Sequence, residues 1–161
     1  MPRLQNKEKE LRSILIRSNK MKDNVFAISA CLLGVNCKYN GKSNLNPNVI
    51  EYLHGKEVVL VCPELLGGLT TPRIISEIQE NNSVKNLENV DVTDNFILGA
   101  KRTLEILHQN NCKNIILKDG SPSCGFMTIY DGSFTGKRIK GMGITARYLR
   151  ENGINILNLE T

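Results

Sequence analysis

The chain has 161 residues, of which 40% are hydrophobic and 23% are charged, and its net charge is +5 at pH 7. This length and composition are typical of one soluble globular domain with a single core. The longest apolar runs, such as residues 58–62, are far shorter than the ~20 residues of a membrane-spanning helix, and the N-terminus has no apolar signal segment. We therefore expect a cytoplasmic protein with no membrane partner.

The net positive charge of the chain comes from its first 22 residues. Residues 1–22 contain seven Lys or Arg and two Glu, and the rest of the chain has 14 basic and 14 acidic residues. Because residues 7–18 predict an amphipathic helix, we expect residues 1–23 to form a basic leader, helical or flexible, that is either solvated or binds a polyanion. The neutral remainder, with four Tyr, four Phe and no Trp, favours a small-molecule substrate over nucleic acid without excluding RNA.

Strand and helix patterns alternate from residue 24 onward. Short apolar runs predict strands at residues 25–30, 58–61, 114–117 and 154–157. The predicted helices are 46–53, opened by Asn46 and Pro47, 94–110, capped by Asp94, and 143–151, ended by Gly153. This alternation predicts an α/β fold, in which residues 24–161 form a single compact domain with a mostly parallel sheet flanked by helices, in a Rossmann-like arrangement.

Three further segments have weaker patterns. Residues 63–72 are rich in Gly, Pro and Thr and predict a loop. Residues 73–93 are mostly polar, with isoleucines spaced for one helical turn. Residues 126–130 predict a strand that pairs with residues near 137–139.

The five cysteines have no regular spacing, which argues against an extracellular disulfide framework and leaves metal binding or catalysis. Cys31 follows the first predicted strand, Cys62 ends the second, and Cys124 lies in the loop after the third. These three thiols should meet at the carboxyl edge of the parallel sheet, where open α/β sheets bind ligands. Cys112 precedes the third strand, so we expect it to be a packed thiol at the opposite edge.

Thiolates that converge on one site need a neutralising cation. A metal ion or an iron-sulfur cluster is the natural occupant, and packing without any ligand is the alternative explanation. Three protein ligands would leave one coordination position open, which is typical of a site that acts on a substrate.

Several short motifs surround these cysteines. They are Cys31-Leu32-Leu33-Gly34, Lys38-Tyr39-Asn40-Gly41, residues 61–69 (VCPELLGGL), Pro72-Arg73, Leu117-Lys118, Ser121-Pro122-Ser123-Cys124-Gly125 and residues 132–143. In this order and spacing, from about residue 25 to residue 158, they resemble the thiouracil desulfurase family. The resemblance implies a compact α/β enzyme that replaces the sulfur of 2-thiouracil by oxygen, giving uracil and sulfide without net redox change.

The same resemblance implies roles for particular residues. It implies a [4Fe-4S] cluster held by Cys31, Cys62 and Cys124, with one iron free to take the substrate sulfur. It also implies that Glu64 is the acid/base residue and that the Ser121 hydroxyl assists at the substrate. Without the resemblance, Glu64 can be read as a solvated loop carboxylate, and Ser121 as a residue that only completes a turn.

Other residues in the motifs are candidate substrate contacts. Arg73 is expected to orient an oxyanion or to offset the charge of the cluster, and the alternative is a surface ion pair with Glu77. Gly67 and Gly68 would let backbone N–H groups approach the inorganic sulfides or the ligand. Ser123 is assigned to the same predicted substrate site.

Two positions depart from the family pattern. Cys37 lies in the loop after Cys31 and is either a spare thiol or a fourth ligand, and Asn40 stands where the family motif commonly has an acidic residue. With Cys37 as a fourth ligand, the chain would be a noncatalytic iron-sulfur or zinc-binding protein. A desulfurase of thiolated bases within RNA, guided by the basic leader, is the other alternative.

Overall fold

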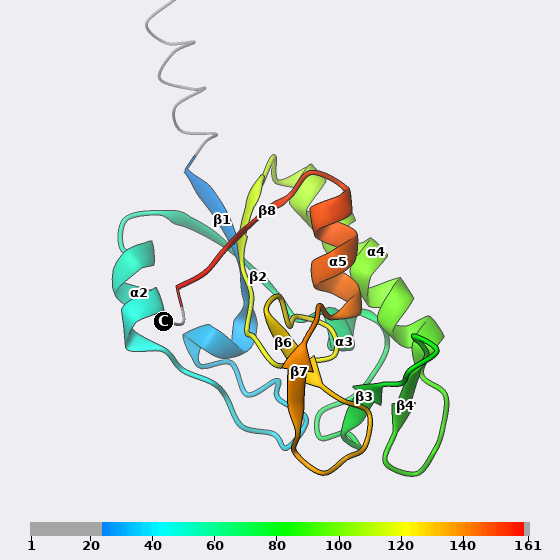
Figure 1. The fold of residues 1–161 in the computed structure, drawn as a ribbon. Coiled ribbons are helices and arrows are strands. Elements are labelled where there is room, and N and C mark those ends of the chain that lie inside the picture. The colour runs from blue at the N-terminus through cyan, green and yellow to red at the C-terminus, as the bar shows by residue number, and fades with distance from the viewer. Residues whose placement is uncertain (1–23, 160–161) are drawn as a thin grey trace, which may run out of the picture.

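Four parallel strands form the centre of the computed structural model, which describes residues 24–159 (Figure 1). The strands are β1 (Val25–Ser29), β2 (Glu57–Val61), β5 (Asn114–Ile116) and β8 (Asn155–Leu157), in the spatial order β2-β1-β5-β8. Each neighbouring pair in this sheet is parallel. The predicted α/β fold is therefore confirmed, whereas the predicted leader, residues 1–23, lies outside the described residues.

Helices cover both faces of this sheet. They are α2 (Pro47–Leu53), α3 (Pro63–Leu66), α4 (Thr93–Gln109) and α5 (Ile144–Glu151), with a 3-10 turn, η1 (Ala30–Leu33), directly after β1. In Figure 1, α2 lies on one side of the sheet, and α4 and α5 lie on the other. Val25 and Ala27 pack with α4 and α5, whereas Phe26 and Ile28 pack with α2. The inner strand β1 is buried throughout and therefore reads as an apolar run, whereas the outer strands β2 and β8 are partly exposed.

The two predicted helix starts differ in their outcome. Asn46 caps α2 as predicted, because its side chain accepts hydrogen bonds from two backbone N–H groups of the first turn. Asp94 does not cap α4, since that helix begins one residue earlier, at Thr93. The Asp91 carboxylate instead accepts a hydrogen bond from the Thr93 N–H at 2.9 Å. Asp94 lies in the first turn, where the helix dipole favours a negative charge.

The polar segment at residues 73–93 forms a β-hairpin, so the predicted helical turn is wrong. The hairpin pairs β3 (Ser76–Ile78) with β4 (Val84–Asn86). In its turn, Asn82 has φ 65°, a left-handed conformation that Asn tolerates better than most residues. Ile78 and Val84 face each other across the pair and are buried with Phe96 of α4. Tertiary packing of alternate residues therefore determines this segment.

A second hairpin lies near the C-terminal half of the molecule. It pairs β6 (Thr128–Tyr130) with β7 (Arg138–Lys140) in antiparallel fashion, which confirms the predicted pairing.

In the part of the chain that the structure describes, no helix combines the length and apolar character needed to cross a membrane.

The predicted loop at residues 63–72 begins with α3, which lies directly against α4. A Cβ atom on Gly67 would come within 2.0 Å of the Asn95 carbonyl oxygen, and one on Gly99 within 2.0 Å of the Pro63 carbonyl oxygen. The Asn95 side-chain amide donates a hydrogen bond to the Gly67 carbonyl at 2.9 Å. Gly67 and Gly99 therefore allow the two helices to touch backbone to backbone.

We expect Gly67→Ala to lower the free energy of unfolding by about 3 kcal/mol, because α3 and α4 must separate to admit the methyl group. Urea unfolding followed by circular dichroism measures this effect. Gly136→Ala is the control, since Gly136 has φ +83° but no heavy atom within 4 Å of an added Cβ. The free energy of unfolding of the control should fall by only about 1 kcal/mol, because alanine is strained in a left-handed backbone conformation. Equal losses in the two variants would contradict the packing role of Gly67.

Candidate active site

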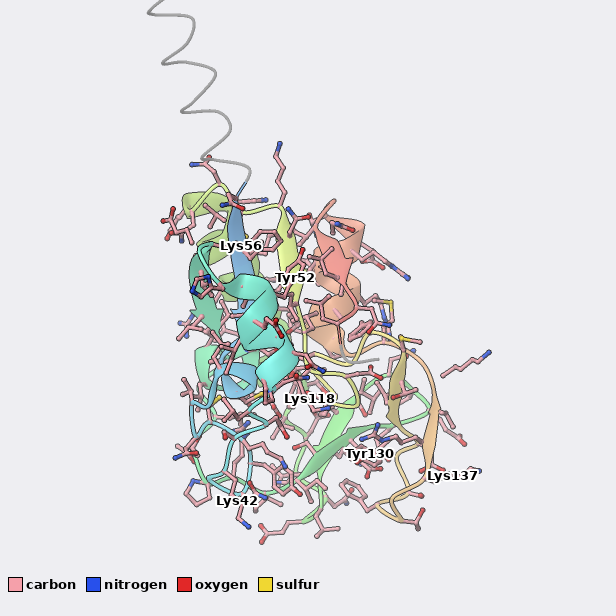
Figure 2. All side chains as sticks on the ribbon, turned by 90° about the vertical axis from the view of Figure 1, so that its left-hand side faces the viewer. Lys42, Tyr52, Lys56, Lys118, Tyr130 and Lys137 are labelled. Carbon is pink, nitrogen blue, oxygen red and sulfur yellow. The ribbon has the colours of Figure 1, made fainter. Side chains whose placement is uncertain are left out.

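A cavity of about 210 Å³ opens at the carboxyl ends of β1, β2 and β5. Its wall includes Ser29 at the end of β1, Val61 at the end of β2 and the loop 118–124 after β5. Cationic and aromatic side chains from several segments complete the wall: Lys38, Tyr39, Arg73, Lys118, Tyr130 and Arg138. Figure 2 labels Lys118, which comes from the loop after β5, and Tyr130, which comes from β6. The cavity is at the sheet edge where the sequence predicts a site.

The three cysteines expected at this edge all line the cavity. Cys31 lies in η1, Cys62 is the N-cap of α3, and Cys124 belongs to the loop after β5; all three are free thiols. Parallel strands bring these distant segments together, because their carboxyl ends lie side by side. Cys112 is buried before β5, where its thiol hydrogen-bonds to the Asn114 carbonyl at 3.0 Å, so the prediction of a packed thiol is confirmed.

Cys31 and Cys62 have surroundings that favour thiolates. A hydrogen bond from the Cys37 thiol is the largest influence on each of them, and it lowers the pKa of both cysteines to about 7 although burial opposes the shift. The Asn44 side-chain amide also donates to the Cys31 sulfur at 3.4 Å. The positive charge of Arg73 further favours the thiolate of Cys62. These donors are of the kind that surround ligating sulfurs.

Cys124 is the most enclosed of the three sulfurs. Burial raises its pKa to about 12, although hydrogen bonds from the Ser29 and Ser123 hydroxyls oppose the shift. The Ser123 oxygen lies 3.7 Å from the Cys124 sulfur. A thiol in such surroundings loses its proton when a cation takes the place of the proton.

The donor set at the cavity suits an iron-sulfur cluster. Thiolates are the ligands of such clusters, and each of the three predicted ligand sulfurs accepts hydrogen bonds from neighbouring groups. Across residues 24–159, no three His, Cys, Asp or Glu side chains are placed to hold a single metal ion. A [4Fe-4S] cluster has a different requirement, because each thiolate binds its own iron and the ligand sulfurs lie farther apart than around one ion.

Glu64 and Arg73 form a largely buried ion pair in the cavity wall. Glu64 lies in the first turn of α3, and its carboxylate oxygen Oε2 accepts a hydrogen bond from Arg73 Nη2 at 3.1 Å. The side chains are 17% and 7% exposed, so Glu64 is not a solvated loop carboxylate. The predicted alternative pairing of Arg73 with Glu77 is wrong, since Glu77 is buried and accepts the Phe134 N–H at 3.0 Å.

The Arg73 guanidinium has a further polar atom directed at no protein partner. Its Nη1 donates to the Thr70 carbonyl and the Thr71 hydroxyl, each at 3.2 Å. Its Nε is buried and has no hydrogen-bond partner within residues 24–159. A buried N–H without a partner is costly, so Nε is a candidate donor to a bound molecule.

Ser121 shapes the loop that carries Cys124. Its hydroxyl oxygen accepts hydrogen bonds from the backbone N–H groups of Ser123 and Cys124, both at 3.1 Å, and lies 2.8 Å from the Ser123 hydroxyl oxygen. The structure therefore agrees with the alternative that Ser121 completes a turn. Ser121 and Ser123 also line the cavity, so a role for either hydroxyl toward a substrate stays a prediction.

Asp119 is a site residue that the sequence patterns did not single out. Its carboxylate accepts hydrogen bonds from the backbone N–H groups of Phe126, Met127 and Thr128 at 2.9 to 3.1 Å. Burial alone would raise the pKa of Asp119, but these bonds outweigh burial and hold the pKa below its ordinary value. The carboxylate thus ties the loop after β5 to β6. An Asp between a strand and a Gly is the signal that indicates such a turn.

Gly67 and Gly68 lie outside the wall of the cavity. The backbone of Gly67 packs directly against the backbone of α4 at Asn95. A Cβ atom added to Gly68 would lie 3.8 Å from the side-chain nitrogen of Asn95. The N–H groups of the two glycines donate to the Pro63 and Leu65 carbonyls at 2.9 and 3.0 Å, and a role for either glycine toward a ligand stays a prediction.

Comparison with known proteins places this site in context. A family model described as 2-thiouracil desulfurase matches residues 26–161. The uncharacterized protein YbbK of Bacillus subtilis (strain 168) is 36% identical over 140 residues, which are 81% of this chain and 93% of that protein. A solved structure, the [4Fe-4S]-dependent thiouracil desulfidase TudS, is 36% identical and superposes with a TM-score of 0.79 over 86% of this chain and 92% of its own.

Proposed function

This chain belongs to the 2-thiouracil desulfurase family, and from that premise we propose that it hydrolyses 2-thiouracil to uracil and sulfide. One observation carries the proposal: the three predicted ligand cysteines, all free thiols, and the Glu64 carboxylate line one cavity at the carboxyl edge of the sheet. The solved relative that is named as a [4Fe-4S]-dependent thiouracil desulfidase supports the same reaction.

Cys31, Cys62 and Cys124 would hold a [4Fe-4S] cluster in this cavity. When bound, the cluster supplies a sulfur-seeking Lewis acid for the thiocarbonyl, without net electron transfer. The hydrogen bonds to Cys31 from Cys37 and Asn44, and to Cys124 from Ser123, would hold the sulfurs in their ligating orientation.

Glu64 would move the protons of the reaction. Conversion of the thiocarbonyl to a carbonyl consumes one water, whose oxygen bonds to the ring carbon while the carbon–sulfur bond breaks. The two protons of the water must leave its oxygen, and the departing sulfide takes up protons. A carboxylate in the cavity wall can accept a proton from water and return it to the sulfur.

Arg73 would fix that carboxylate and contact the substrate. Its Nη2 holds Glu64 at 3.1 Å, while its buried Nε can donate to the substrate oxygen. We assign to Ser121 and Ser123, which share a hydroxyl contact in the same wall, the recognition of polar edges of the pyrimidine.

The function is tested by adding 2-thiouracil to the anaerobically reconstituted full chain and measuring sulfide and uracil together. We expect both products in equal amounts, with no reductant or oxidant consumed. A chain that carries the cluster but releases no sulfide would contradict the proposal. A parallel assay with an RNA containing 2-thiouracil bases tests the alternative substrate. If the chain released sulfide from this RNA but not from free 2-thiouracil, the small-molecule assignment would be wrong.

A further inference from the structure

The β6–β7 hairpin lies beside the β3–β4 hairpin, below the central sheet in Figure 1. Ile129 of β6 is buried with Ile78 of β3 and Phe96 of α4, in a small core that the two hairpins share with that helix. The next residue, Tyr130, lines the cavity of the candidate active site together with Arg138 of β7. Because successive side chains of a strand point to opposite faces, the hairpin has one face in this core and the other at the cavity.

Tyr130 and Arg138 are held together in the cavity wall. They are opposite each other in the hairpin, Arg138 Nη2 donates to the Tyr130 hydroxyl at 3.3 Å, and the guanidinium carbon lies 5.1 Å from the ring centre. The guanidinium also lies against Gly120, where an added Cβ would meet Nη2 at 2.9 Å. Gly120 belongs to the loop that carries Cys124. The position of the hairpin therefore determines where these two polar side chains stand in the wall.

Glu77 of β3 is a buried carboxylate that the proposed reaction does not use. It is 2% exposed, and its Oε2 accepts a hydrogen bond at 3.0 Å from the N–H of Phe134, in the turn between β6 and β7. Phe134 has φ 57°, a left-handed conformation that is strained for a bulky residue and persists where contacts around it enforce it. A buried carboxylate is likewise costly unless it is hydrogen-bonded. The bond between Glu77 and Phe134 therefore satisfies both residues and fixes the turn.

The same turn is packed directly against the backbone of β3. Gly132 has φ +89°, and an added Cβ would come within 2.7 Å of the Ile78 carbonyl oxygen. The Gln79 side-chain amide donates to the Glu77 carbonyl at 3.2 Å and to the Gly132 carbonyl at 3.4 Å. Ser76, the neighbour of Glu77 in β3, lines the cavity. One strand therefore supports the turn of the second hairpin and also forms part of the cavity wall.

We propose that Glu77 is a positioning residue for substrate binding, because it holds the β6–β7 hairpin where Tyr130 and Arg138 can contact the substrate. This inference rests on the proposed function, in which 2-thiouracil binds in the cavity. A guanidinium can donate to the carbonyl of a pyrimidine, and a phenol hydroxyl can accept from its ring N–H. Glu77 itself lies outside the cavity wall formed by the described residues. Loss of its hydrogen bond should therefore weaken substrate binding and leave the chemical step intact.

The test compares Glu77→Met and Glu77→Gln with the unaltered full chain after anaerobic reconstitution. Met occupies a similar volume but has no oxygen acceptor, whereas Gln retains an oxygen that can accept the Phe134 N–H. The KM and kcat of sulfide release from 2-thiouracil are measured, together with iron per chain. We expect Glu77→Met to raise KM at least about 10-fold, with kcat within about threefold and iron unchanged. Glu77→Gln should keep KM within about threefold of the unaltered chain.

A second pair of variants moves the turn without altering Glu77. Gly132→Ala places a methyl group against the Ile78 carbonyl, so it should lift the turn from β3 and raise KM at least about 10-fold with kcat retained. Gly136→Ala is the matched control, because Gly136 precedes β7 with a similar φ of +83° but has no heavy atom within 4 Å of an added Cβ. Its KM should stay within about twofold of the unaltered chain. Equal KM values for the two variants would overturn the proposal, and this pair decides it if Glu77→Met does not fold.

Hydrogen exchange of the Phe134 amide, measured by NMR on the full chain, tests the positioning step without substrate. Glu77→Met should exchange this amide at least about 10-fold faster than the unaltered chain, and Glu77→Gln should exchange it at nearly the unaltered rate. For Glu77→Met, unchanged exchange, an unchanged KM or a joint loss of kcat and iron would each overturn the proposal. Failure of the unaltered, cluster-loaded chain to release sulfide contradicts only the proposed function, and exchange of the Phe134 amide then decides whether Glu77 holds the hairpin.

Discussion

Replacing Glu64 by Gln is expected to lower the rate of sulfide release from 2-thiouracil by at least about 100-fold, with the iron content unchanged. The amide oxygen of Gln can still accept the hydrogen bond that Arg73 Nη2 gives to Glu64 at 3.1 Å, so the wall of the cavity should keep its shape. What the variant loses is the capacity to take a proton from water. The rate is measured by methylene-blue detection of sulfide, and the cluster by its visible absorbance.

The controls for this variant separate proton transfer from loss of charge. Glu57→Gln removes a carboxylate from the exposed start of β2 and should leave the rate within about twofold of the unaltered chain. Glu64→Asp keeps a carboxylate on a side chain one methylene shorter. Its rate of sulfide release should lie between the rates of Glu64→Gln and of the unaltered chain. If Glu64→Gln kept a rate within about threefold of the unaltered chain while binding a full cluster, Glu64 would not be the acid/base residue.

The sheet and the convergence of the cysteines could be predicted because both follow from local patterns. Strands that are buried on both faces read as apolar runs, and the positions where these runs end locate the carboxyl edge. Cys31, Cys62 and Cys124 each follow such an end, so topology alone brings them to one cavity. The packed state of Cys112 follows from the same rule, since it lies before its strand.

The partners of the site residues could not be predicted in the same way. Arg73 meets Glu64 because the chain returns to α3 after the loop that follows Gly68, and nothing in the local sequence distinguishes that partner from the nearby Glu77. The position of Cys37 depends on how residues 34–44 fold back onto η1. Loop conformations of this kind depend on many weak contacts at once. A sequence motif can therefore identify a site residue without identifying the residue that it contacts.

The same limit applies to Gly67, whose contact with α4 could not be predicted. A pair of glycines beside a predicted ligand cysteine is equally compatible with close approach of a cofactor and with close approach of another helix. The structure brings Asn95 and Gly99 of α4 to that position, and the amphipathic pattern of α4 gives no sign of this contact because the meeting point is backbone. The glycines therefore support the site through the packing of α3, whose N-cap is Cys62.

Cys124→Ala is expected to lose the cluster, with iron falling below about one atom per chain after reconstitution, because two remaining thiolates cannot retain a cluster that needs at least three protein ligands. Sulfide release from 2-thiouracil should fall to the level without enzyme. Iron, acid-labile sulfide and visible absorbance are measured on the anaerobically prepared full chain.

Cys112→Ala is the matched control, since Cys112 and Cys124 are both buried thiols of the same core cluster and each variant removes one sulfur atom. Both should lose about 1 kcal/mol of stability from the missing packing. Only Cys124→Ala should lose iron, because Cys112 hydrogen-bonds to the Asn114 carbonyl at the opposite edge of the sheet. Retention of a complete cluster by Cys124→Ala would remove Cys124 from the ligand set and would make Cys37 the thiol to test next.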